Sequence, residues 1–95
     1  MSDLKQRIIV VSDSHNHHEL LKRIYEYENS NYSGSILYLH CGDSCCKYQD
    51  QIEPFISVRG NMDYLDELPF YKEIQVYKHK IFMTHGHFFN SKSIN

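Results

Sequence analysis

The segment IIVVSDSH, residues 8–15, decides the fold, because four consecutive β-branched residues run directly into a polar loop. Such an apolar run is typical of a strand that is buried on both faces, as the strands of parallel sheets are. Asn16 followed by Glu19 has the form of a helix capping box. The apolar residues within 20–27 then recur at helical spacing. This part of the sequence predicts a strand, a polar loop and a helix that ends near Asn29.

Further strands are predicted along the rest of the chain. Residues 36–39 and 55–58 are short apolar runs of the buried kind. A strand, a helix and a second strand in this order favour a parallel crossover. Residues 70–77 alternate between apolar and polar, and residues 80–83 are again mostly apolar, so the polar pair at 78–79 predicts the turn of a hairpin. The fold class expected from these elements is α/β.

The composition narrows the class of protein. The chain has 95 residues, 10 of them basic and 12 acidic, and this balance gives no reason to expect nucleic-acid binding through bulk charge. No apolar run approaches the roughly 20 residues of a membrane span, and residues 1–7 lack the apolar core of a secretory signal. The crowded cysteines Cys41, Cys45 and Cys46 disfavour a disulfide framework. We therefore expect a cytoplasmic protein with no membrane partner.

Residues that can bind a metal ion recur directly after the predicted strands. Asp13 and His15 follow the first strand, Asp43 the second and Asn61 the third, while His85 follows the last. Ligands of open α/β sheets bind beyond the carboxyl ends of the strands. Each fragment alone is weak evidence, since Gly-Asp and Gly-Asn pairs are ordinary turn sequences. Their shared placement predicts one site, most firmly for the first three strands, because the last strand could run in another direction.

Four segments carry a resemblance to a known family. SDSH at 12–15, HCGD at 40–43, VRGNMD at 58–63 and THGH at 84–87 resemble four successive motifs of the calcineurin-like metallophosphoesterases. The most similar branch is that of the small bacterial and archaeal phosphodiesterases. The resemblance implies an α-β-β-α sandwich whose loop end hydrolyses a phosphoester, most readily a phosphodiester, with two divalent metal ions.

The resemblance also implies a role for each candidate ligand. Asp13 and His15 would bind one metal ion. Asp43 would bridge both ions, and Asn61 and His85 would bind the second. Asp43, Asn61 and His85 are accordingly the residues expected to take part in catalysis. A ligand set of oxygen and imidazole fits Mn first, with Fe, Ni or Zn as alternatives, and does not fit Ca.

Other residues have a functional and a structural interpretation side by side. Arg59 could contact the phosphate of a substrate or pair with a carboxylate. His87 could bind substrate or orient a ligand. His17 and His18 are expected to be exposed in the first turn of the helix. The remaining histidines are expected to pack or to be solvated, at His40 and His79 respectively. The cysteines lack the spacing of a zinc site, so we expect free thiols.

The sequence also departs from the family pattern. A later Gly-His-x-His motif, which gives one histidine to each metal ion in the family, does not occur in this sequence. We therefore expect a single incomplete domain over residues 1–95, truncated before its C-terminal strands. Its exposed apolar surface would promote self-association, and its activity alone would be low. Two alternatives stay open: a non-catalytic scaffold like the vacuolar sorting protein of this fold, and a fragment of a longer gene.

Overall fold

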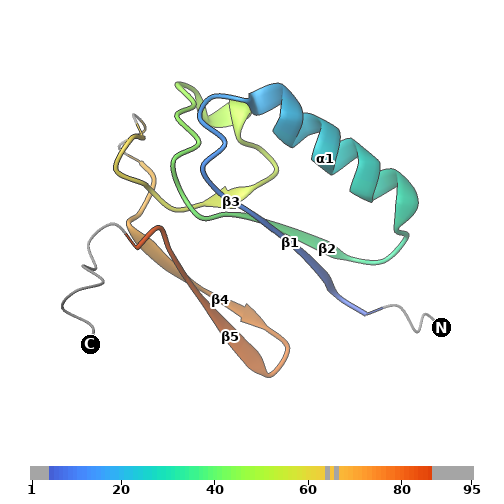
Figure 1. Cartoon of the computed structure of the whole chain (residues 1–95). Helices are drawn as coiled ribbons and strands as arrows, with labels where there is room; N and C mark the ends of the chain where they lie inside the picture. The colour runs from blue at the N-terminus through green and yellow to red at the C-terminus, as the bar shows by residue number, and fades with distance from the viewer. Residues whose placement is uncertain (1–4, 64, 66, 87–95) are drawn as a thin grey trace.

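The computed structural model describes residues 5–63, 65 and 67–86, which form three layers (Figure 1). The elements are β1 (Arg7–Val11), α1 (His18–Asn31), β2 (Ile36–His40), the short 3-10 helix η1 (Gln49–Gln51), β3 (Ile56–Ser57), β4 (Tyr71–Val76) and β5 (His79–Thr84). The helix lies on one face of a three-stranded sheet, and the β4–β5 hairpin lies on the other side. The α/β class predicted from the sequence is confirmed.

The central sheet is parallel and has the order β1-β2-β3. Arg7 pairs with Ile36 at one end of the β1–β2 ladder, and Val11 pairs with His40 at the other. The strand-helix-strand crossover expected from the sequence is therefore present. Because β1 and β2 end in register, the loops that follow them start side by side.

The helical side of the sheet holds one hydrophobic core. Leu21 of α1 is buried against Tyr38, Ile52 and Phe55. The Tyr38 ring makes edge-on contacts with Phe55 and with Tyr25, at 5.3 Å between ring centroids in each pair. This packing explains why Tyr25 occurs on the inner side of the helix.

The other side of the sheet packs against the hairpin. Leu39, Val58 and Met83 are buried there together, which joins β2 and β5. In the antiparallel hairpin Val76 pairs with His79, so the turn lies at residues 77–78. The predicted turn was one residue too late, because Tyr77 adopts the left-handed conformation (φ 53°) that a tight turn requires. His79 is consequently the first residue of β5.

The start of α1 also differs from the expectation. The N-cap is His17, which makes no side-chain capping bond, and the helix begins at His18. Asn16 instead has φ 68°, and its N–H donates to the Ser44 carbonyl. The predicted capping box is therefore wrong, because Asn16 is used to join two loops. The helix ends at Asn31, two residues beyond the expected end.

The strand β1 is not buried on both faces within the described part of the chain. Val10 is 59% exposed and Ile8 is 36% exposed. The hairpin-side core draws on β2, β3 and the hairpin, so the corresponding face of β1 is left open.

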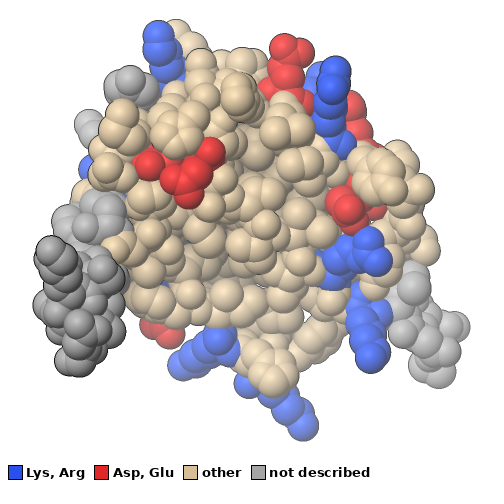
Figure 2. Space-filling view, in the orientation of Figure 1, with Lys and Arg blue, Asp and Glu red and all other residues tan. Residues whose placement is uncertain are grey.

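Figure 2 shows charged side chains dispersed around one face of the molecule, with other residues across its centre. Among the described residues no helix has the length and apolar character to cross a membrane.

Candidate metal centre

Backbone hydrogen bonds join the loops that follow β1 and β2. The Asp13 N–H donates to the Gly42 carbonyl at 2.9 Å, and the His15 N–H donates to the Asp43 carbonyl at 3.0 Å. His85 follows β5, whose carboxyl end lies at the same edge of the molecule (Figure 1). Three segments far apart in the sequence therefore meet at this edge.

The same two loops hold an unusual backbone. Asp13, His15, Asn16, Asp43 and Cys45 all have φ between 47° and 68°. Residues other than glycine adopt this left-handed region uncommonly, and such conformations persist where the surroundings enforce them, often at functional sites. Five such residues lie in these two loops. The fold therefore enforces an unfavourable backbone conformation in order to place these side chains.

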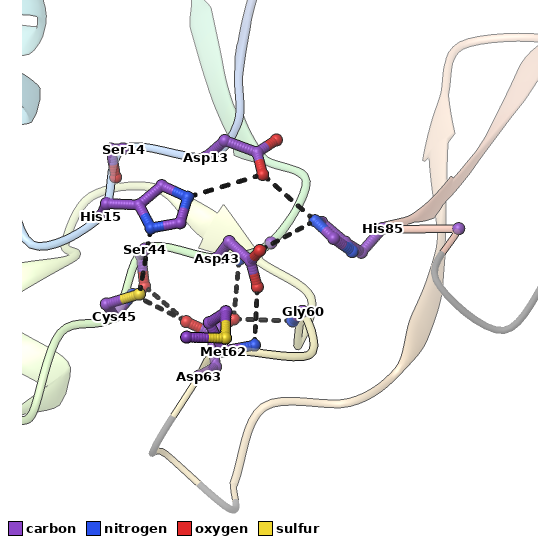
Figure 3. Close-up of polar contacts among 12 residues, drawn as sticks. Asp13, Ser14, His15, Asp43, Ser44, Cys45, Gly60, Met62, Asp63 and His85 are labelled. Atoms are coloured by element: carbon purple, nitrogen blue, oxygen red, sulfur yellow. Dashed lines mark hydrogen bonds and ion pairs between the residues drawn. The ribbon is translucent and has the colours of Figure 1, made fainter.

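The side chains of four predicted ligands converge (Figure 3). Asp13, His15 and Asp43 offer donor atoms that all lie within 4.8 Å of one another. His85 reaches the two carboxylates from the opposite side. Its Nε2 lies 3.3 Å from Asp13 Oδ1 and 3.3 Å from Asp43 Oδ2. Two carboxylates and two imidazoles are thus aimed at one small volume.

The electrostatics of the cluster fit a bound cation. A hydrogen bond from the Ser12 side chain, and then interactions with His85, lower the pKa of the Asp13 carboxyl, which is therefore ionised at neutral pH. Asp43 is only 4% exposed. Bringing a buried carboxylate close to a second one costs free energy unless a positive charge compensates. Oxygen and imidazole donors in this arrangement suit a divalent transition-metal ion.

The remaining predicted site residues lie at different distances from this cluster. Asn61 is exposed in the turn after β3, between residues whose N–H groups bond to Asp63 and Asp43. Among the described contacts of the cluster, its amide makes none. Arg59 donates from Nε to the Leu68 carbonyl at 3.0 Å and lies over the Phe70 ring. His87 lies outside the described residues. The substrate roles of Arg59 and His87 therefore stay predictions.

Cys45 contributes to the centre in a way that the sequence did not reveal. Its Sγ lies 3.8 Å from His15 Nδ1, while His15 Nε2 faces Asp13 Oδ1 at 3.8 Å. Burial raises the pKa of the Cys45 thiol, which keeps it protonated at neutral pH. When His15 Nδ1 carries the ring proton and donates it to this sulfur, the Nε2 lone pair is left available as the ligand atom of His15. All three cysteines are free in the structure.

His40 is a buried support of the same loops. Its side chain is fully buried; Nδ1 accepts the Gly42 N–H at 3.1 Å and Nε2 lies 2.9 Å from Ser14 Oγ. Because Nδ1 is an acceptor, Nε2 carries the proton and donates to Ser14. The packing role expected for His40 from the sequence is correct, and the residue also links the two loops.

We expect His40 to make stability depend on pH. Burial lowers the pKa of His40 below its usual 6.5, so the unfolded chain binds the proton more readily. The contribution of neutral His40 is complete above the unfolded pKa. It is lost as the pH falls from that value through the lower pKa of the folded state. Urea unfolding of His40→Gln should show a smaller loss of free energy between pH 7 and pH 5 than the unchanged chain. Equal losses in both would contradict this role.

The fold and the cluster together define an α/β protein whose metal-capable side chains gather at the loop end of a parallel sheet. The calcineurin-like phosphoesterase superfamily domain matches this chain over residues 7–95. The chain belongs to that superfamily, and the resemblance of the four sequence motifs is confirmed.

Two relatives agree with this membership. The chain is 31% identical over 81 residues to a protein of Bacillus subtilis strain 168 described as probable metallophosphoesterase YsnB, covering 84% of this chain and 46% of that one. A crystal structure from Streptococcus pneumoniae TIGR4, described as a predicted phosphoesterase, has a TM-score of 0.76 at 30% identity. That match covers 97% of this chain and 52% of the other. The chain thus spans about half the length of both relatives.

Proposed function

We propose that this chain supplies the ligands of a two-metal site that hydrolyses a phosphodiester. One observation carries the proposal: the Asp13 and Asp43 carboxylates, from two different loops, lie equally close to the one Nε2 of His85. A single imidazole nitrogen holds one proton and cannot satisfy both carboxylates. A divalent cation between these side chains would satisfy all of them. Membership of a phosphoesterase family supports the reaction class.

The proposed roles are those that the family resemblance implies, and the convergence of Asp13, His15, Asp43 and His85 supports them. Asp13 and His15 would hold one ion, and Asn61 and His85 the other. Asp43 would contact both, as the resemblance implies; its position between the Asp13–His15 side and His85 supports this role. When bound, the ions would polarise the phosphate and lower the pKa of water. We expect Mn first, with Fe, Ni or Zn as alternatives.

The protein's own residues would set the net charge of the site and the orientation of the metal ligands. Two carboxylates against two divalent ions leave a net positive site, which attracts a phosphoester anion. The Met62 N–H restricts the Asp43 carboxylate to one orientation. The thioether side chain of Met62 has no proton to give to a leaving group. A substrate with a good leaving group should therefore react most readily. Arg59, two residues beyond the end of β3, is the candidate for holding a phosphate oxygen.

The proposal is tested with two chromogenic substrates at saturating Mn²⁺. We expect slow hydrolysis of bis-p-nitrophenyl phosphate, and slower hydrolysis of the monoester p-nitrophenyl phosphate. EDTA and Asp43→Asn should each abolish the reaction. The matched control Asp50→Asn changes an exposed carboxylate of η1 and should retain it. A rate that survives Asp43→Asn would contradict the proposal, and Mn²⁺ binding without any turnover would favour the scaffold alternative.

A further inference from the structure

The carboxylate of Asp63 accepts four hydrogen bonds, three from the loop after β2 and one from the turn after β3 (Figure 3). Its Oδ2 accepts the N–H of Asp43 at 2.9 Å and that of Gly60 at 2.6 Å. Its Oδ1 accepts the N–H of Cys45 at 2.8 Å and the Ser44 hydroxyl at 3.2 Å. One half-buried side chain therefore holds the main chain from Asp43 to Cys45.

This arrangement connects Asp63 to the Asp43 side chain as well. Met62, the neighbour of Asp63, donates its N–H to Asp43 Oδ1. The turn after β3 is held to the loop after β2 by the bonds of Asp63 to Gly60 and Asp43. A shift of that turn would move the Met62 N–H away from Asp43. Asp63 thus controls both the backbone and the carboxylate orientation of Asp43.

The geometry points to Asp63 as a positioning residue of the metal centre, an inference that rests on the proposed function. Asp63 does not belong to the group Asp13, His15 and Asp43, whose ligand atoms lie together. A carboxylate is needed because its two oxygens accept all four bonds, which are strengthened by its charge. Asparagine has one acceptor oxygen and an NH₂ group, so two of the four donors would face another donor.

The inference is tested by calorimetric titration of Mn²⁺ into Asp63→Asn. We expect the Kd for Mn²⁺ to rise about 10-fold to 100-fold, the range typical of residues that orient metal ligands. The exposed control Asp50→Asn should leave the Kd unchanged. Circular dichroism in EDTA establishes that each variant is folded at the titration temperature. The electron paramagnetic resonance spectrum of bound Mn²⁺ should also change in Asp63→Asn, because a displaced Asp43 alters the ligand geometry.

The outcomes separate this inference from the proposed function. If the unchanged chain binds no Mn²⁺, the proposed function fails and the inference fails with it. If the unchanged chain binds Mn²⁺ and folded Asp63→Asn gives the same Kd and spectrum, the inference alone is overturned. If Asp63→Asn does not fold, Ser44→Ala removes one of the four donors and keeps the carboxylate. That variant should raise the Kd several-fold, and an unchanged Kd would overturn the inference.

Discussion

Asp43→Ala should weaken Mn²⁺ binding by more than about 100-fold, beyond the range for residues that only orient a ligand. Asp43 is the most buried carboxylate of the cluster, and its two oxygens face different partners, Met62 and His85. A residue that contacts both ions removes a ligand from each when it is lost. Its loss also removes the negative charge that offsets repulsion between two cations. Calorimetric titration of Mn²⁺ measures the effect.

Asn61→Ala provides the comparison within the same site. Asn61 is exposed and neutral, and it is proposed to contact one ion only. We expect a loss of about 10-fold, at the lower end of the range for single partners of a metal site. Equal and small losses from Asp43→Ala and Asn61→Ala would contradict a bridging role for Asp43.

Gly60→Ala should disrupt the centre and destabilise the fold. A Cβ on Gly60 would lie 2.5 Å from the backbone nitrogen of Asp43 and 2.7 Å from its Cγ. Real Cβ atoms do not approach backbone so closely, so the two loops would have to separate. We expect the free energy of unfolding to fall by about 1–3 kcal/mol, as for other overpacked sites. Mn²⁺ affinity should fall with it, because the separation moves Asp43.

Gly34→Ala is the matched control for this substitution. Gly34 lies before β2, at the opposite end of that strand from Asp43, and its φ is not positive. Urea unfolding and Mn²⁺ titration should show little change for Gly34→Ala. Gly60→Ala with the stability and affinity of the unchanged chain would show that the close approach of Gly60 to Asp43 is unimportant.

The placement of the site could be predicted from the sequence because it depends on strand ends. The apolar runs that became β1 and β2 identified two parallel strands, and Asp13 and Asp43 follow them directly. Their carboxyl ends share an edge of the sheet, whatever the details of the loops. His85 was less certain from the sequence, because its place depended on the direction of the hairpin. The structure brings β5 back to the same edge.

The supporting contacts could not be predicted, because they form between distant loops. Asn16 has the spacing of a helix cap, but its backbone N–H instead forms a tertiary hydrogen bond to the Ser44 carbonyl. In the sequence Asp63 is only the last residue of the motif at 58–63. The four hydrogen-bond donors that it accepts lie up to 20 positions away, so the sequence does not reveal them. The exposure of Val10 depends on how far the hairpin extends over the sheet, which no local pattern encodes.

We propose above that Asp13, His15, Asp43 and His85 surround bound metal ions. An anomalous difference map from a crystal grown with Mn²⁺, recorded near the manganese absorption edge, tests it most directly. The predicted map has two peaks, one near Asp13 and His15 and one near Asn61 and His85, with Asp43 within coordination distance of both. A single peak at Asp13, His15 and Asp43 would refute the second ion. A map with no peak at these residues, while Mn²⁺ is bound elsewhere on the chain, would contradict the claim itself.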